Sequence, residues 1–299
     1  MSFDKLKRRK TKLSDMVKEA ESGGRNSAKD ERFWQPTADS VGTGSATIRF
    51  LPSKSDESVP WVKIWDHGFQ GPTGLWYIEN SRTTIGEEDP VSEYNSKLWE
   101  TGLEMNKKIA RDQKRRLHYI SNIMVISDPA NPKNDGQVFL FKYGSKLFDK
   151  IKDAMSPEYD DETPYDPFDF WEGANFRLKF HVGDNKFRTY EKSQFSSVSP
   201  LSEDDSELEA IYNKMYDLSE FVDPANFKSY EELKLQLRKV LRLDDTTANA
   251  VKNEDALEHK VDQPIIKESA YESPTESVSE DTPDDDDNLA FFERLANED

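Results

Sequence analysis

The sequence predicts an α+β fold in which a series of short strands is followed by two helices. From about Thr43 onward, aromatic and β-branched residues recur in short runs that Gly and Pro separate, as is typical of strands joined by turns. Helical spacing takes over near Ser206 and continues to Arg242. Outside this region charged and polar residues dominate. We therefore expect one folded core between two polar terminal segments.

The first terminal segment, residues 1–22, predicts a basic arm and a short helix. Its cations are Lys5, Lys7, Arg8, Arg9, Lys10 and Lys12. Asp4 is the only acid among the first dozen residues. Apolar residues between Leu13 and Ala20 then recur at helical spacing, and Gly23 ends the pattern.

The predicted core spans residues 23–243. Strands are expected at residues 46–51, 61–65, 75–78, 119–126, 137–143 and 175–182. The last of these alternates apolar with charged residues, which predicts one buried and one exposed face. Helices are expected at residues 90–112, 146–155, 206–218 and 230–241. Ser229 and Glu232 match a capping box at the start of the last helix.

The second terminal segment, residues 244–299, predicts a disordered acidic tail. From Lys252 onward it contains 16 acids and 4 bases, so it carries 12 of the 18 net negative charges. Such a composition cannot bury enough apolar area to offset chain entropy. The acidic run is Asp284, Asp285, Asp286 and Asp287, and a possible amphipathic turn with Leu289, Phe292 and Leu295 follows it. A protein partner could bind and order this turn.

Several classes of function are excluded by what the sequence lacks. The chain has no Cys, which excludes disulfides and thiolate metal sites. No apolar run is long enough to cross a membrane, and no phosphate-binding loop or nucleophile elbow is present. The four His residues have no metal-ligand spacing. Acidic groups at residues 158–162 and 203–205 lie in loop-like segments, which are poor scaffolds for a two-metal nuclease site.

Basic and aromatic residues are interleaved along the strand-like segments. This combination suits single-stranded nucleic acid, because cations bind phosphates and ring faces stack on unpaired bases. The candidate residues are Arg49, Lys107, Lys108, Arg111, Lys114, Arg115, Arg116, Tyr119, Phe141, Tyr143, Phe187 and Tyr190. This interpretation requires an open, positively charged trough within a chain of net charge −18.

Three alternatives remain open at this point. The rings can instead form the hydrophobic core and the cations a solvated face, which is the commoner fate of aromatic residues. The chain can be a protein-interaction adaptor that acts through its acidic tail and does not bind nucleic acid. A metal-dependent nuclease is the third alternative, and we rank it last.

The chain resembles the single-stranded DNA-binding, or helix-destabilising, proteins of T-even-type bacteriophages. Similarity runs in order across most of residues 5–242. The most specific stretches are Ala46–Lys54, His67–Phe69, Trp76–Glu79, Asn122–Val125 with Asp128–Ala130, and Trp171–Phe176. Together these stretches are far more specific than any single motif.

The resemblance implies an OB-fold-like β-barrel core with added helices and no enzymatic activity. It implies cooperative, largely sequence-independent binding that protects single-stranded DNA in replication, recombination and repair. It also implies self-association along the strand through the arm, whose matching residues are Lys7, Arg8, Arg9, Lys10 and Thr11. The acidic tail would recruit replication and recombination proteins. The expected location is the cytoplasm of the infected bacterial host.

The resemblance also implies a zinc site of one His and three Cys, which this sequence does not retain. His67 matches the histidine, whereas Ser81, Ser92 and the region near Asp89 stand where the cysteines would be. Because neutral hydroxyls cannot replace thiolates as Zn²⁺ ligands, we predict no zinc and no other cofactor. We expect packing of Tyr94, Leu98 and Trp99 to hold the 80–100 segment instead.

Overall fold

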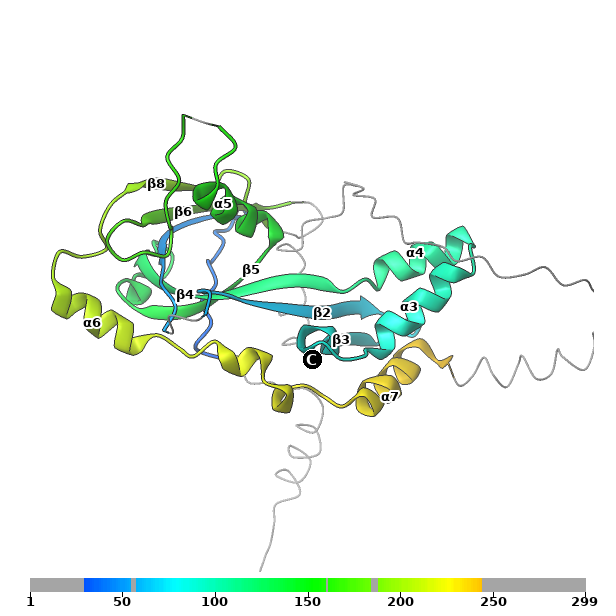
Figure 1. The fold of residues 1–299 in the computed structure, drawn as a ribbon. Helices are drawn as coiled ribbons and strands as arrows, with labels where there is room; N and C mark the ends of the chain where they lie inside the picture. Colours follow the sequence, from blue (N-terminus) through cyan, green and yellow to red (C-terminus); the bar gives the residue numbers. More distant parts are fainter. Residues whose placement is uncertain (1–29, 55–57, 160, 184–187, 244–299) are drawn as a thin grey trace, which may run out of the picture. The chain divides into compact units, whose positions relative to one another are not determined.

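A computed structural model describes residues 30–54, 58–159, 161–183 and 188–243 (Figure 1). The basic arm, the acidic tail and Phe187 lie outside these described residues. The chain divides into two compact units. The first contains the described residues up to Val62 and His118–Leu218, and the second contains Lys63–Leu117 and the described residues from Ser219 onward.

The first unit is built on a curled antiparallel sheet that forms a half-barrel (Figure 1). Its strands are β1 (Thr43–Phe50), β4 (Arg116–Ser127), β5 (Val138–Gly144), β6 (Ala174–Val182), β7 (Arg188–Thr189) and β8 (Gln194–Val198). Strand β1 pairs with β4 on one side and with β6 on the other. Strand β5 adds to β4, while β7 and β8 both pair with β6. The predicted α+β class is therefore confirmed.

Strand alternation places the core of the first unit on the inner face of this sheet. Along β6, Phe176, Leu178 and Phe180 are buried, whereas Arg177 and Lys179 are exposed. This confirms the two-faced strand predicted from its period-two pattern. The buried rings contact one another, and the ring of Phe50 is the centre of this packing. Its centroid lies 5.6 Å from Tyr143, 5.4 Å from Phe168 and 5.8 Å from Phe176.

Two helices complete the first unit, α5 (Ser145–Met155) and α6 (Asp205–Lys214). The α6 helix begins at an Asp204 cap and buries Leu208 and Ile211. These residues pack in a second apolar cluster with Leu51 and Phe170. The predicted helix at 206–218 is therefore present but ends four residues early, because Met215 is already extended.

The second unit combines a hairpin with three helices. The hairpin strands are β2 (Val62–Gln70) and β3 (Trp76–Asn80), with His67 opposite Glu79. The helices are α3 (Pro90–Glu100), α4 (Glu104–Asp112) and α7 (Tyr230–Leu241). A short 3-10 turn, η1 (Arg82–Ile85), precedes α3, and two more, η3 (Ser219–Val222) and η4 (Pro224–Asn226), precede α7. The predicted capping box at Ser229 and Glu232 is present.

An apolar cluster joins the hairpin to two of these helices. It contains Phe69, Tyr77, Val91, Leu233, Leu237 and Val240, with Tyr94 packed against it. Helix α3 contacts both α4 and α7 (Figure 1). The single helix predicted at 90–112 is wrong, because Gly102 has a φ of 72° and separates α3 from α4. That left-handed conformation favours glycine and allows the chain to reverse.

No helix among the described residues is long and apolar enough to span a membrane.

Candidate nucleic-acid interface

The rings predicted to line an open trough are buried in the first unit. Tyr119 and Tyr190 are each 6% exposed, Phe141 is 2% exposed and Tyr143 is 1% exposed. Phe187 lies outside the described residues. Of the five predicted stacking rings, the four that the structure describes are therefore not open, and the alternative that they form the hydrophobic core fits instead.

The physical reason is that other rings of the same unit already cover them. Tyr119 stacks on Phe148 of α5 with 3.8 Å between centroids, and Tyr143 lies 5.4 Å from Phe141. The Trp34 ring packs edge-on against Phe141, with 5.5 Å between centroids. Strand register explains the grouping, because Tyr119 pairs directly with Tyr143, and Phe141 lies two residues away on the same face.

Arg49 is also buried, with no exposed surface. Its Nη2 donates to the carbonyl oxygens of Asp169 at 2.8 Å and Ser199 at 3.0 Å. Gly173 makes this approach possible, because a Cβ there would clash with the guanidinium. The expectation of Arg49 at an open phosphate site is therefore wrong for this structure, where the side chain ties loops to the sheet.

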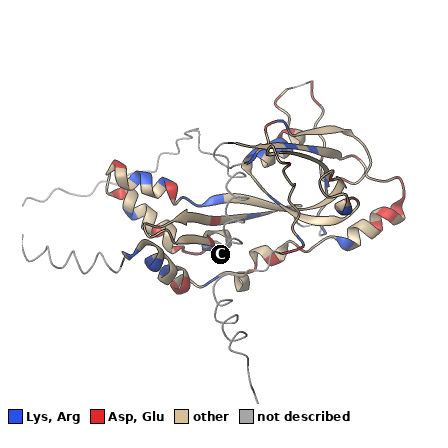
Figure 2. Ribbon diagram, turned by 180° about the vertical axis from the view of Figure 1, so that it is seen from behind, with Lys and Arg blue, Asp and Glu red and all other residues tan. Residues whose placement is uncertain are grey.

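The predicted cations of the second unit are accessible. Lys108, Arg111 and Lys114 are exposed, and Lys107 is half-buried. They follow one another along α4 and toward the start of β4, where Figure 2 shows a concentration of Lys and Arg. Helix α6 of the first unit, in contrast, carries mainly acids. Positive charge is therefore local within an anionic chain, as the sequence predicts.

Arg115 and Arg116 are half-buried and have structural contacts of their own. The Arg115 guanidinium lies 4.5 Å from the centroid of the Trp65 ring, and Arg116 donates to the carbonyl oxygen of Gly68. Both side chains therefore make contacts that help to position the start of β4. Lys107, Lys108, Arg111 and Lys114 are the more available members of the set.

Trp99 is the ring that sequence reasoning did not assign to this surface. It is 49% exposed at the end of α3, so the expectation that Trp99 packs to hold the 80–100 segment is wrong. The Lys107 Nζ and the Arg111 Cζ lie 5.8 Å and 5.5 Å from its ring centroid. Leu98 is half-buried, and only Tyr94 of the three packs against the apolar cluster.

A sequence signal for this grouping existed but depended on recognising the turn at Gly102. Lys107 and Arg111 are four residues apart and therefore share one face of α4. Once the chain reverses at Gly102, that face meets the last turn of α3, where Trp99 lies. We call Trp99, Lys107, Lys108, Arg111 and Lys114 the α4 patch.

Carboxylates do not form a catalytic metal site in the part of the chain that the structure describes. Within it, no group of three or more His, Asp or Glu side chains is arranged to hold a metal ion. The described acids of residues 158–162 and 203–205 are exposed. Nothing in these described segments favours the nuclease alternative.

Comparison with known proteins points to one family. Residues 42–241 match the family model described as gp32 DNA binding protein like. The single-stranded DNA-binding protein of Enterobacteria phage T2 is 38% identical over 259 residues, which cover 83% of this chain and 84% of that protein. The protein of the same name from Enterobacteria phage T4 is 38% identical over 246 residues, with 79% and 80% covered. A third, from Escherichia phage SV14, is 44% identical over 86 residues, which cover 28% of this chain and 75% of that protein.

Proposed function

Because this chain belongs to the gp32-like DNA-binding protein family, we propose that it binds single-stranded DNA and that the α4 patch is part of its binding surface. The relatives are named for DNA binding, and the chain acts as a binding protein, not as an enzyme. The observation that supports the proposed site is an exposed tryptophan, Trp99, with the cations Lys107 and Arg111 beside its ring on a chain of net charge −18.

The α4 patch has the two components that a single strand requires. Its cations can neutralise phosphates, and the Trp99 ring offers a face for an unstacked base. Lys107 already pairs with Glu104 at 2.9 Å, and Arg111 lies 3.9 Å from the same carboxylate. Because these pairs are solvent-exposed they contribute little to stability. A phosphate can therefore replace Glu104 at small cost.

We extend the proposal to the family's finer properties. The curled half-barrel of the first unit is proposed to be an OB-fold. The basic arm is proposed to mediate cooperative self-association along the strand, and the acidic tail to recruit replication and recombination proteins. The site of action is proposed to be the cytoplasm of an infected bacterium. The charge distribution of the chain supports the roles of the arm and the tail.

A titration with oligo(dT) of graded length at two salt concentrations tests the proposed function. Binding should quench tryptophan fluorescence, and the affinity should fall with salt at a slope of about −0.7 per phosphate contact. Removal of residues 1–12 should weaken binding to long strands more than to short ones. A protein-interaction adaptor would show no quenching at any length.

Substitution of Trp99 tests whether the α4 patch contacts bases. Trp99→Ala should weaken oligo(dT) binding by about 1–3 kcal/mol, or roughly 5- to 150-fold in Kd, because one stacked base is lost. Trp171→Ala is the matched control, since Trp171 is similarly exposed at 57% but lies between Asp169 and Glu172. Equal affinities of the two variants would show that Trp99 does not contact DNA, whereas the proposal that the protein binds DNA would still stand.

A further inference from the structure

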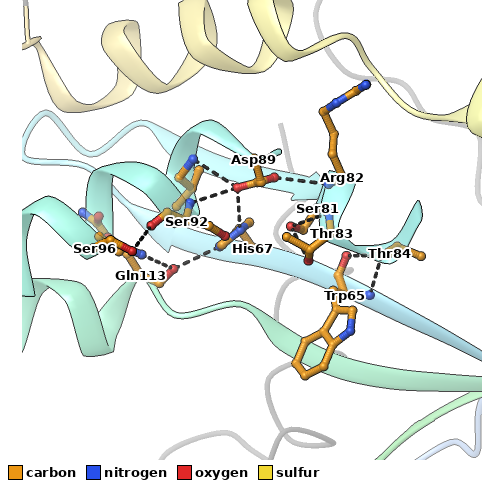
Figure 3. Close-up of polar contacts among 12 residues, drawn as sticks. Trp65, His67, Ser81, Arg82, Thr83, Thr84, Asp89, Ser92, Ser96 and Gln113 are labelled. Atoms are coloured by element: carbon orange, nitrogen blue, oxygen red, sulfur yellow. Dashed lines mark hydrogen bonds and ion pairs between the residues drawn. The ribbon is translucent and has the colours of Figure 1, made fainter. Parts of the chain in front are cut away.

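A buried polar pair lies at the centre of the second unit. His67 on β2 and Asp89 are 1% and 2% exposed. The imidazole Nε2 lies 3.2 Å from Asp89 Oδ1, and the Nδ1 lies 3.0 Å from the carbonyl oxygen of Gln113 (Figure 3). Burial of such groups is costly unless every polar atom has a hydrogen-bond partner. The neighbouring residues provide these partners.

Asp89 receives hydrogen bonds on both carboxylate oxygens. Its Oδ1 caps α3 by accepting the amides of Val91 and Ser92, each at 3.0 Å. Its Oδ2 accepts the Arg82 amide at 3.2 Å. Burial opposes ionisation of Asp89, but the hydrogen bond and charge of His67, with the Ser92 amide, outweigh it and lower the carboxyl pKa to about 2. Asp89 is therefore a carboxylate in the folded protein.

The pair joins four segments that are distant in the sequence. His67 belongs to β2, Arg82 begins η1, Asp89 caps α3, and Gln113 is the C-cap of α4. Asn95 of α3 donates to the same Gln113 carbonyl at 3.1 Å. Hydrogen bonds from one buried pair thus fix the relative positions of a strand and two helices, which is the task that a structural metal performs in small domains.

The residues at this position do not fit the zinc site that the family resemblance implies. Each His67 nitrogen faces an oxygen, one of Asp89 and one of the Gln113 carbonyl, so both ring nitrogens already have a partner within the protein. A metal ion bound to either nitrogen would have to displace one of these contacts. The Ser81 hydroxyl is 3.0 Å from the Thr83 hydroxyl, and a neutral hydroxyl is a poor Zn²⁺ ligand.

We propose that the His67–Asp89 pair is a metal-free structural centre, which does through hydrogen bonds what bound zinc would otherwise do for the second unit. The fold and the DNA affinity of this protein are then independent of zinc. The inference goes beyond the proposed function, because it concerns what holds the unit together whether or not DNA is bound.

The test uses the full-length wild-type protein. Elemental analysis after purification should find far less than one zinc per chain. The thermal unfolding midpoint and the affinity for oligo(dT) should be unchanged by a chelator and by added Zn²⁺. One zinc per chain together with a lower midpoint in chelator would overturn the proposal.

A pair of histidine substitutions makes the test specific. His67→Asn should lower the unfolding midpoint by the same amount with and without chelator, because it removes a partner of the buried carboxylate. His181→Asn is the matched control, since His181 is exposed on β6, and it should leave the midpoint unchanged. If His67→Asn does not fold, the wild-type measurements still decide the question. A His67→Asn midpoint equal to that of the wild type would contradict the structural role.

Discussion

Replacement of Asp89 by alanine is expected to destabilise the protein by about 3–5 kcal/mol, as is typical when the charged partner of a buried, hydrogen-bonded pair is removed. The substitution leaves the buried imidazole of His67 without its acceptor and removes the cap of α3 and the acceptor of the Arg82 amide. Urea unfolding followed by far-ultraviolet circular dichroism measures the loss. Asp89→Asn should be milder, because an amide oxygen can still cap the helix.

Ser229→Ala is the matched control for the helix cap. Ser229 caps α7 in the same unit, but its capping box is exposed and contains no buried charge. Its loss should cost about 1 kcal/mol. A difference of several kcal/mol between the two alanine variants isolates the contribution of the buried pair. Equal losses would mean that Asp89 serves only as a helix cap.

The dependence of stability on pH should also differ between the wild type and Asp89→Ala at acid pH. The carboxyl pKa of Asp89 is lowered in the folded protein from 3.8 to about 2, so its contribution is complete above the unfolded value and is lost as the pH falls toward the folded value. Below pH 4 the wild type should therefore lose on the order of 2 kcal/mol more stability than Asp89→Ala. Parallel acid limbs of the two proteins would contradict this assignment.

Sequence patterns predicted best those elements whose signal is local, either an alternation of apolar and polar residues that matches burial or a motif within a few residues. Strand β6 alternates in sequence and in burial, and the capping box at Ser229 is a local motif that needs no distant partner. The break at Gly102 was missed because polar residues on both sides continue helical spacing, and one glycine is compatible with a weak helix. Strands β7 and β8 were missed because they are short and polar.

The exposure of the rings could not be predicted because it depends on residues far away in the sequence. Tyr119 and Phe141 sit among cations and look available in isolation. Whether their face is open depends on Phe148 of α5 and on Trp34, which cover them only in the folded chain. The family resemblance implied that His67 and the region near Asp89 lie close together, but the hydrogen bonds that replace a metal between them are visible only in the structure.

Removal of three cations from the α4 patch is expected to weaken oligo(dT) binding on the order of 100-fold at about 0.1 M salt. The variant is Lys107→Ala, Lys108→Ala and Arg111→Ala combined. Each lost phosphate contact removes about 0.7 from the slope of log affinity against log salt, so the slope should become shallower by about 2. Alanine is the most favourable helix residue, so α4 should remain folded. Fluorescence titration at several salt concentrations measures both quantities.

The control must remove the same charge from the same unit, because removing cations anywhere on an anionic protein increases its long-range repulsion of DNA. Lys234, Arg238 and Lys239 on α7 meet this requirement. Their combined replacement by alanine changes the net charge equally and should leave the salt slope unchanged, because a general field effect does not remove a phosphate contact. If both triple variants lose the same affinity and the same slope, net charge alone accounts for binding, and α4 is not the DNA surface. A shallower slope in the α4 variant alone identifies the helix whose cations contact the strand.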